Sequence, residues 1–468
     1  MNRHEFLIYC ELYKRKEFDK IPIGAYDNGV RYYMTPKQIA ICELISDDHT
    51  IEAGYGGSAR SGKTQIESVI IIFESFCYPG IAWGLCRKEL VILKKTVLIT
   101  FQRQLSFYGI TDKDYTFDGE LNMYNFNMGS AVFLINTEFK PSDNLNTRFG
   151  SFELTRVAID ESNEANVTVV HKLFERTGWR CNDKYGLKRK VLECFNPAKN
   201  HVYTRYYKPY RDKKESDQRR FVPALPSDNP NPAVKEWIDD LLKSDTDKTT
   251  IQRQVYGNFE YDDDPSALVD YDAICDMFTN SHVQPGAKKI SSDLAMQGRD
   301  RFLAVYWSGL IGSFELDKEK ADGKSIETDL TKLKTDKGVP NSKMIADADG
   351  LGNYLSGYIQ SMVEFRGGSR AKDPDKYDNL KSECAWTLAK AINDRSVLIL
   401  CTEAQQEKIK EELSICLKRA NLDSDTQKRK LISKEVMKQL LGRSPDYLDV
   451  LLMGMYEGKK ERKGQSAL

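Results

Sequence analysis

Residues 57–64 carry the sequence feature that most restricts how this chain can fold. They read Gly-Ser-Ala-Arg-Ser-Gly-Lys-Thr, which fills every fixed position of the phosphate-binding loop pattern GxxxxGK[ST]. In this loop, backbone N–H groups and a helix N-terminus face the phosphates of a nucleotide. The flanking runs 51–55 and 65–73 suit a strand before the loop and a helix after it. The motif therefore predicts an α/β nucleotide-binding domain rather than a chance glycine-rich turn.

Each position of the loop has an expected role toward ATP. Lys63 is expected to reach the β and γ phosphates, and the Thr64 hydroxyl to hold Mg²⁺. A Cβ at Gly57 or Gly62 would block the turn or the phosphates. The predicted nucleotide-binding residues of the loop are Gly57, Ser58, Ala59, Arg60, Ser61, Gly62, Lys63 and Thr64.

The run 156–161 supplies a second motif about a hundred residues further on. It reads Arg-Val-Ala-Ile-Asp-Glu, an apolar stretch that ends in two acids. This pattern predicts a buried parallel strand whose acids lie at its carboxyl edge, beside the phosphate loop. Asp160 is expected to accept from the hydration shell of Mg²⁺, and Glu161 to orient or deprotonate the attacking water. A strand that ends in an ordinary polar turn is the weaker interpretation here.

Two further polar residues lie where a nucleotide site would use them. Gln38 follows two tyrosines upstream of the loop, where its amide could read the adenine edge while an aromatic ring stacks on the base. A helix start at 35–36 explains the same residues, and the two interpretations are compatible. Asn196 follows the apolar run 190–195, the position expected of a γ-phosphate sensor that couples hydrolysis to movement.

The bulk composition limits the class of protein. The chain has 468 residues, of which 40% are hydrophobic and 29% charged, and this predicts two to three soluble domains. No apolar run approaches the ~20 residues of a membrane span, and the charged N-terminus does not resemble a signal peptide. Ten scattered cysteines form no CxxC pair, so we expect a reducing cytoplasm and neither a zinc ribbon nor a disulfide framework.

Charge is balanced over the whole chain, with 69 basic and 69 acidic residues. This balance argues against a surface coated throughout for nucleic acid, but local DNA-binding patches are compatible with it. Candidates are 199–220, where basic residues alternate with four tyrosines, and the tail 459–463. Charge runs are more often solvated faces.

From about residue 286 the chain changes character. The run 289–295 predicts a strand that carries Asp293, a polar turn follows at 297–300, and 302–307 predicts the second strand of a hairpin. The polar segment 310–340 is expected to be an insertion beside this hairpin. An acidic run at 262–264 marks a domain boundary.

Acidic residues recur at the ends of the later elements. The run 344–347 predicts a strand that ends at Asp347, with Asp349 two residues on. A helix that starts at Pro445 places Asp446 and Asp449, three residues apart, on one face.

Acids on a first strand, a later strand and a C-terminal helix form the arrangement of a ribonuclease H-like nuclease. Clustered carboxylates repel one another, and two divalent cations remove that cost while activating a water and stabilising a leaving oxygen. Oxygen-only ligands select Mg²⁺ or Mn²⁺ over zinc. The competing interpretation is four unrelated surface aspartates, because Asp is common at strand ends and caps.

Taken in order, these motifs resemble the large terminase subunit of tailed bacteriophages over nearly the whole chain. The most specific pieces are the segments 56–64, 87–90 (Arg-Lys-Glu-Leu), 228–230 (Asp-Asn-Pro), 254–259 (Gln-Val-Tyr-Gly-Asn-Phe) and 442–449. The resemblance implies an α/β chain with an N-terminal P-loop ATPase domain (a mostly parallel sheet flanked by helices) and a C-terminal ribonuclease H-like nuclease domain. The expected boundaries are 1–262 for the motor with its lid and linker, 263–285 for a connector and 286–468 for the nuclease.

The resemblance also implies an activity, a set of site residues and partners. It implies an ATP-driven motor that threads double-stranded DNA through a portal protein into a procapsid, and a Mg²⁺- or Mn²⁺-dependent endonuclease. Further expected features are a small terminase subunit, a homo-oligomeric ring, no membrane, and residence in the host cytoplasm and transiently on the procapsid but not in the mature virion. The implied catalytic residues are Lys63, Arg60, Glu161, Asp293, Asp347 and Asp449; Thr64, Asp160, Asp293, Asp347, Asp446 and Asp449 are the implied metal ligands, with Asp446 or Asp349 as a possible fourth in the nuclease.

Several alternatives stay open at this point. The γ-phosphate needs a positive charge in the transition state, for which Arg60 and Arg87 are candidates, in cis or across a subunit boundary. A helicase or repair ATPase with a fused nuclease is the main alternative function. A non-enzymatic assembly scaffold and a transposase-type integrase fit less well.

Overall fold

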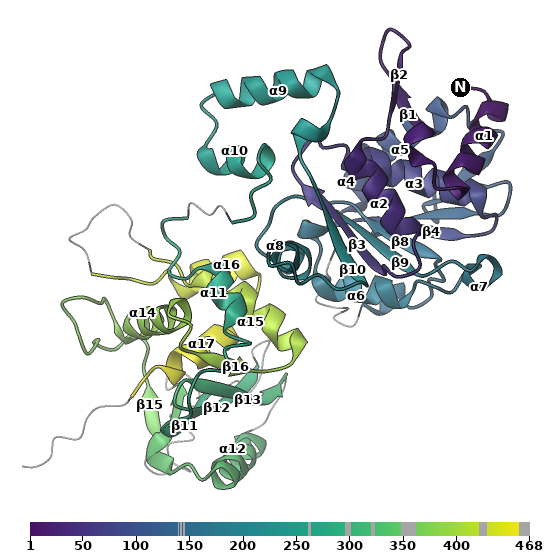
Figure 1. The fold of residues 1–468 in the computed structure, drawn as a ribbon. Coiled ribbons are helices and arrows are strands. Elements are labelled where there is room, and N and C mark those ends of the chain that lie inside the picture. The colour runs from purple at the N-terminus through teal and green to yellow at the C-terminus, as the bar shows by residue number, and fades with distance from the viewer. Residues whose placement is uncertain are drawn as a thin grey trace, which may run out of the picture. The chain divides into compact units, whose positions relative to one another are not determined.

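A computed structural model describes residues 1–138, 140, 143, 146–260, 264–294, 301–319, 323–347, 362–420 and 428–457. The chain forms two compact units, Met1–Asp263 and Asp264–Leu468, and each is described by itself (Figure 1). The predicted connector, 263–285, belongs to the second unit from Asp264 on. Within the described ranges, no helix is both long enough and apolar enough to cross a membrane.

The first unit is built on a sheet that is parallel around the phosphate-binding loop. In the described part of this unit, eight strands lie in the order β10-β3-β9-β8-β4-β7-β6-β5. Those from β10 to β7 run parallel, and β6 and β5 extend the sheet antiparallel. The strands are β3 (Glu52–Gly57), β4 (Ala82–Arg87), β5 (Tyr115–Asp118), β6 (Met123–Phe126), β7 (Ala131–Asn136), β8 (Arg156–Ile159), β9 (Lys190–Phe195) and β10 (Arg219–Ala224). The predicted mostly parallel sheet is confirmed.

Helices pack on both faces of this sheet because alternate strand residues point to opposite sides. Trp83 and Leu85 of β4 join one apolar core with α1, α2, α3 and α5, whereas Ala82 and Cys86 join a second core with α6. The helices are α1 (Arg3–Lys14), α2 (Pro36–Ser46), α3 (Lys63–Cys77), α4 (Leu90–Lys95), α5 (Val97–Phe107), α6 (Val167–Glu175), α7 (Asn182–Tyr185) and α8 (Lys208–Arg211). Since α3 is almost entirely buried, it needs apolar residues around most of its circumference, and the run 69–73 supplies them.

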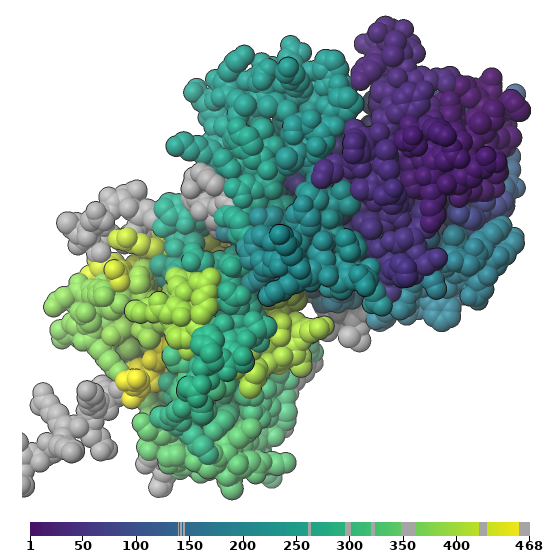
Figure 2. Space-filling view, in the orientation of Figure 1, coloured from purple at the N-terminus to yellow at the C-terminus, as the bar shows by residue number. Residues whose placement is uncertain are grey.

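The first unit also carries two smaller features. The hairpin β1 (Pro22–Ala25) and β2 (Arg31–Tyr33) stands apart from the main sheet. Near the end of the unit, α9 (Pro232–Lys243) and α10 (Lys248–Gln254) form a small helical lobe, which is visible in the space-filling view (Figure 2). Asn231 caps α9 by accepting from the Ala233 N–H at 3.0 Å, and Pro232 occupies its first turn.

The second unit has a mixed sheet with the strand pattern of ribonuclease H. In its described residues the order is β15-β14-β11-β12-β13-β16; β11, β12 and β13 form an antiparallel meander, and β14 runs parallel to β11. Strand β15 is parallel to β14, and β16 to β13. The strands are β11 (Lys288–Asp293), β12 (Phe302–Ser308), β13 (Ile311–Lys318), β14 (Met344–Asp347), β15 (Val363–Phe365) and β16 (Leu398–Leu400). Both the predicted hairpin and the ribonuclease H-like fold class are confirmed.

One expectation for this unit is wrong. The segment 310–340 is no insertion beside the hairpin: it supplies β13 and then α12 (Gly323–Lys337), which buries Ile326, Leu330 and Leu333 against the sheet. The polar sequence misled because β13 is half-exposed and α12 buries only a narrow apolar stripe. The other helices are α11 (Tyr271–Asp276), α14 (Leu380–Asn393), α15 (Glu403–Cys416), α16 (Lys434–Leu441) and α17 (Asp446–Gly454).

Candidate functional site

The phosphate-binding loop joins β3 to α3 at the carboxyl edge of the first sheet. Gly57 has φ +145°, and a Cβ there would lie 2.3 Å from the Ala224 carbonyl oxygen. Gly62 has φ +84°, and a Cβ there would lie 2.8 Å from Nε2 of Gln38. Backbone packing therefore requires glycine at position 57, and the left-handed φ favours it at position 62, in addition to the space that phosphates would need.

Asn196 links the loop lysine to the expected catalytic glutamate. Strand β9, which lies between β3 and β8 in the sheet, delivers Asn196 to this position. Its Oδ1 accepts from Lys63 Nζ at 3.0 Å, and its Nδ2 donates to both Glu161 carboxylate oxygens at 2.8 and 2.7 Å. Lys63 also donates to the Ser58 carbonyl. A neutral amide thus holds a cation and an anion in fixed positions.

The two residues of the first unit that are expected to hold Mg²⁺, Thr64 and Asp160, contact each other. Thr64 Oγ1 donates to Asp160 Oδ1 at 3.2 Å, so the hydroxyl and carboxylate that would hold Mg²⁺ already face each other. The other oxygen of Asp160 accepts from Arg87 at 2.8 Å, and Arg87 also donates to Thr96. These oxygen ligands fit Mg²⁺ in donor type.

Burial displaces the pKa values of the charged groups in this site. Desolvation lowers the pKa of Lys63 against the opposing effect of Glu161 and Asp160. It raises the pKa of Asp160 against Arg87, and it raises the pKa of Glu161, an effect to which the Asp160 charge adds. A raised pKa suits Glu161 as a base for water, because it increases the proton affinity of the carboxylate that Asn196 holds.

An open pocket of about 240 Å³ lies directly beside these groups. Its lining residues are Ala59, Arg87, Glu161, Asn163, Glu164, Asn196, Pro197, Thr250, Arg253 and Gln254. Glu161 and Asn196 mark it as the place where a γ-phosphate would lie. Arg253 and Asn163 were not predicted from the sequence, because neither stands in a recognisable motif.

Gln38, which lies beside the loop, and Arg60, which lies within it, already have partners. Gln38 Oε1 accepts from the Thr35 N–H at 2.9 Å in a capping box at the start of α2, and its Nε2 donates to the Gly62 carbonyl at 3.4 Å. A role for Gln38 in reading adenine stays a prediction. The Arg60 guanidinium stacks over the Trp237 ring of α9, 4.9 Å from its centroid.

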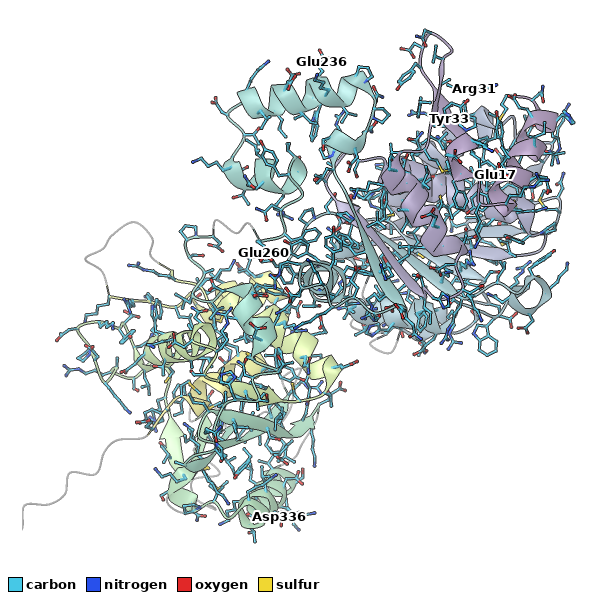
Figure 3. All side chains as sticks on the ribbon, in the orientation of Figure 1. Glu17, Arg31, Tyr33, Glu236, Glu260 and Asp336 are labelled. Atoms are coloured by element: carbon cyan, nitrogen blue, oxygen red, sulfur yellow. The ribbon has the colours of Figure 1, made fainter. Side chains whose placement is uncertain are left out.

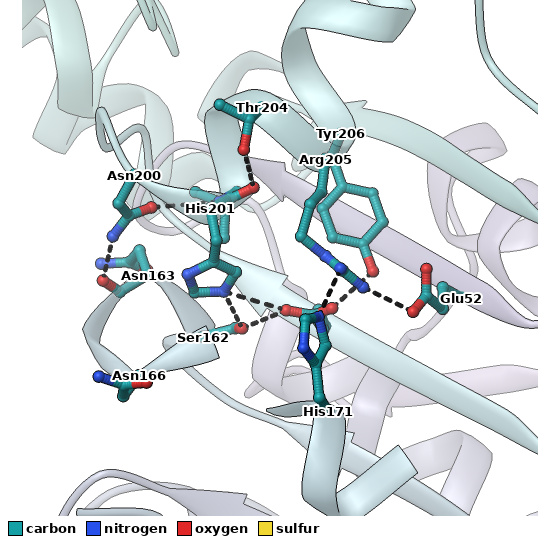
Figure 4. A network of polar contacts seen from close by, with 12 residues as sticks. Glu52, Ser162, Asn163, Asn166, His171, Asn200, His201, Thr204, Arg205 and Tyr206 are labelled. Atoms are coloured by element: carbon teal, nitrogen blue, oxygen red, sulfur yellow. Dashed lines mark hydrogen bonds and ion pairs between the residues drawn. The ribbon is translucent and has the colours of Figure 1, made fainter. Parts of the chain in front are cut away.

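A buried polar network includes Ser162, the residue that follows Glu161 (Figure 4). Ser162, the next residue, donates to Glu193; Tyr206 OH donates to the other Glu193 oxygen at 2.7 Å; and His201 Nε2 lies 3.4 Å from the same carboxylate. Burial raises the pKa of Glu193, but the hydrogen bond and charge of His201, the charge of Arg205 and the Ser162 hydroxyl outweigh it and lower the pKa to about 2. Since His201 meets both Ser162 and Glu193 through one nitrogen, the group is no hydrolase triad.

In the second unit, two of the predicted acids emerge at one edge of the sheet. Ser292 of β11 pairs with Ala346 of parallel β14, so Asp293 and Asp347, one residue further along each strand, lie side by side. Helix α17 packs against β11, where Ser291 Oγ donates to the Val450 carbonyl at 2.9 Å. This contact fixes the helix face that carries the remaining acids.

Asp446 and Asp449 are both buried on α17, and two lysines contact Asp449. Asp449 Oδ1 accepts from Lys381 at 2.6 Å, and its Oδ2 accepts from Lys434 at 3.0 Å. Asp446 Oδ2 accepts from the Arg301 N–H at 3.1 Å. Tyr447 lies between the acids in sequence, but its hydroxyl donates to Asp317 at 2.7 Å. Asp349 lies outside the described residues.

The acids of the second unit oppose one another electrostatically. Burial raises the pKa of Asp293 well above its usual range, and the charges of Asp449, Asp446 and Asp347 add to this effect. Burial also raises the pKa of Asp449, but Lys381 and Lys434 outweigh it and lower that pKa. In the described part of the chain, no three His, Cys, Asp or Glu side chains are yet arranged to hold a metal ion. The all-carboxylate donor set fits Mg²⁺ or Mn²⁺, and coordination by Asp449 would replace a lysine contact.

A groove of about 380 Å³ adjoins these acids and was not predicted. It is lined by Asp347, Phe365, Gly367, Gly368, Asp378, Asn379, Lys381, Ser382, Lys430, Leu431, Ile432, Ser433, Lys434, Asp449, Leu452 and Met453. Two of its three lysines, Lys430 and Lys434, lie four residues apart, whereas Lys381 comes from α14 about fifty residues earlier, so the sequence does not show that they share one groove.

Comparisons with protein-family models and with curated proteins find no match to this chain. Among solved structures, the large terminase of a thermophilic bacteriophage in complex with ADP matches with 14% identity and a TM-score of 0.39 over 90% of this chain and 98% of that one. The nuclease domain of the large terminase subunit gp2 of bacterial virus Sf6 matches with 19% identity and a TM-score of 0.35 over 41% of this chain and 98% of that one. These values are too low to transfer residue roles. Both of these solved structures are large terminases, the family that the motifs of this chain also resemble.

Proposed function

We propose that this protein is a viral DNA-packaging motor that combines ATP hydrolysis with metal-dependent cleavage of double-stranded DNA. The observation that carries the proposal is the presence of two different phosphate chemistries in one chain. The first unit positions a lysine, an asparagine and a glutamate for γ-phosphate hydrolysis. The second gathers buried aspartates that repel one another until cations bind.

ATP hydrolysis in the first unit follows from the position of Glu161. The loop N–H groups and Lys63 bind the phosphates, and Thr64 and Asp160 would hold Mg²⁺, which neutralises developing charge on the phosphate oxygens. Asn196 keeps Glu161 aimed at the pocket, where the carboxylate orients water and accepts its proton. Because Asn196 touches both Lys63 and Glu161, loss of the γ-phosphate changes the forces on β9 directly.

DNA cleavage in the second unit depends on Asp293, Asp347, Asp446 and Asp449. These carboxylates would hold divalent cations, which lower the pKa of a bound water and stabilise the leaving oxygen. Lys381 and Lys434, which pair with Asp449, also line the adjoining groove, and a cation that replaces them at Asp449 would leave them to attract the phosphates of a DNA strand. The natural substrate is a long duplex cut at the start and end of packaging.

The proposed assembly has a portal protein and a small terminase subunit as partners, a ring of motor subunits on the procapsid, and the host cytoplasm as its location. These features rest on the motif resemblance stated above.

A triplex-displacement assay tests the motor. A translocase that moves along intact duplex strips a third strand from it in an ATP-dependent manner. We expect strand displacement with ATP and none with Glu161→Gln, while a forked duplex stays paired. Unwinding of the fork without triplex displacement would instead support the helicase alternative.

A further inference from the structure

Arg253 of α10 lines the pocket that also borders Glu161 and Asn196. Its guanidinium donates from Nε and Nη2 to one acceptor, the Pro197 carbonyl, at 3.2 and 2.8 Å. Pro197 follows Asn196 directly, and both line the 240 Å³ pocket together with Arg253 and Glu161. A single neutral carbonyl is a weak partner for a cation, because hydrogen bonds from a guanidinium to an anion are roughly twice as strong as bonds between neutral groups.

Two other arginines near this pocket, Arg87 and Arg60, already contact other side chains. Arg87 forms an ion pair with Asp160 at 2.8 Å, with its side chain 15% exposed. The Arg60 guanidinium stacks on Trp237 of α9. Moving Arg87 to a phosphate would cost it a carboxylate partner, whereas Arg253 would exchange only a carbonyl for a phosphate.

The backbone around Arg253 is tied to the nucleotide loop and to the segment that follows. Its carbonyl accepts from Ser58 Oγ of the loop at 3.4 Å. Six residues on, Phe259 stacks on Tyr207 with ring centroids 4.3 Å apart. Glu260, labelled in Figure 3, accepts from the Tyr203 hydroxyl at 3.0 and 2.9 Å. These contacts join the segment that follows Arg253 to the rest of the first unit.

We propose that Arg253 is a catalytic arginine of the ATPase, which leaves the Pro197 carbonyl to bind the γ-phosphate from within the same chain. The inference rests on the proposed ATPase function and names the cationic group that neither Arg60 nor Arg87 supplies. Arginine groups in this role raise phosphoryl-transfer rates by about 10³ to 10⁵. Binding of the γ-phosphate then breaks the Arg253–Pro197 contact between α10 and the segment that follows β9.

The test compares the full-length wild-type chain with Arg253→Ala and Arg253→Lys, and with Lys248→Ala as an exposed control on the same helix. Steady-state ATP turnover is measured, and the affinities for ADP and ATPγS are measured separately with Mg²⁺ present. We expect Arg253→Ala to lower kcat at least about 100-fold. It should weaken ATPγS binding about tenfold and leave ADP binding within twofold, since only the γ-phosphate contact is lost. Arg253→Lys should recover ATPγS binding in part, and Lys248→Ala should match wild type.

The outcomes separate this inference from the proposed function. If the wild-type chain neither binds nor hydrolyses ATP, the proposed ATPase function itself is wrong. An active wild type with Arg253→Ala within threefold of its kcat would overturn the role of Arg253 alone. Equal losses of ADP and ATPγS affinity would also overturn it, because they indicate a structural effect on the loop.

Discussion

Glu193 in the first unit and Asp293 in the second are both buried carboxyl groups, yet their pKa values move in opposite directions. Glu193 accepts from Ser162 and Tyr206 and lies beside His201, and its pKa falls to about 2. Asp293 faces Asp449, Asp446 and Asp347, and its pKa rises well above the usual range. Donors surround one acid and other acids surround the second. The nucleotide site is therefore organised before its ligand arrives, whereas the acid cluster needs cations to become organised.

The two units also reduce the free-energy cost of burying charged side chains in different ways. In the first unit, a neutral asparagine separates Lys63 from Glu161, so both charges keep a partner without neutralising each other. In the second unit, Lys381 and Lys434 compensate Asp449 until a metal ion does so. An unpaired buried charge destabilises the folded state, and a neutral amide in the first unit and two lysines in the second offset this effect.

The largest expected effect is a loss of ATP turnover in the first unit with DNA cleavage by the second unit retained. Lys63→Ala removes the cation that contacts Asn196 and the expected phosphates, so ATP turnover should fall at least about 10²-fold. DNA cleavage by the second unit should stay within twofold of wild type. Phosphate release and plasmid nicking measure the two rates. Lys37→Ala, a change at a half-buried lysine of α2, is the control, and loss of nicking in Lys63→Ala would refute the separation.

Acid titration sharpens the contrast next. The folded-state pKa of Glu193 is depressed, so its contribution to stability is full above its unfolded value near 4.5 and is lost as the pH falls toward 2. Between pH 5 and pH 3 the stability advantage of wild type over Glu193→Gln should shrink by about 2 kcal/mol. Denaturant unfolding of the first-unit transition measures this. The exposed change Glu153→Gln should show no such pH dependence; a constant Glu193→Gln difference would contradict the assigned donors.

Divalent cations should stabilise the second unit selectively. At ten times its dissociation constant, a bound ion adds about 1.4 kcal/mol to the folded state. Mg²⁺ should therefore raise the second-unit melting midpoint by about 3–5 °C, and EDTA should reverse the shift. Scanning calorimetry of the nucleotide-free chain resolves it. A Mg²⁺ shift that persists in Asp293→Asn would show that the ion binds somewhere else.

The smallest expected effect is a gain in stability. Without metal, Asp293→Asn removes a carboxyl that neighbouring acids disfavour, so at pH 8 the second-unit midpoint should rise by about 2–4 °C, or about 1 kcal/mol. Because the folded pKa of Asp293 is raised, the gain should shrink as the pH falls toward the unfolded value near 4. Asp336→Asn on the exposed side of α12 is the matched control (Figure 3). A fall in the Asp293→Asn midpoint at pH 8 would mean that Asp293 is stabilised by an unrecognised donor.

The sequence predicted the parts of both sites that local patterns specify. The loop 57–64 dictates its own turn, and the acids at the carboxyl ends of β8, β11 and β14 follow from parallel strands that end at one edge of their own sheet. The partners that complete each site come from distant segments. Arg253 reaches Pro197 across 56 residues, and Lys381 reaches Asp449 across 68. No periodicity or motif encodes such pairs, because they arise only when packing brings the elements together.

The prediction that 310–340 is an insertion was wrong for a related reason. Its strand and helix bury few apolar side chains, so their sequence resembles a solvated loop even though β13 pairs with β12 along its length. Hydrophobic pattern reveals an element only where the element buries enough apolar surface to need one.

The most direct test measures ATP turnover and plasmid cleavage in the same solution for wild type, Glu161→Gln and Asp293→Asn, with Mg²⁺ or EDTA. We predict a reciprocal result. Glu161→Gln loses ATP turnover and keeps cleavage, Asp293→Asn loses cleavage and keeps ATP turnover, and EDTA abolishes both in wild type. Loss of both activities in each folded variant would contradict two separable centres, and metal-independent cleavage would contradict the acid cluster as the nuclease.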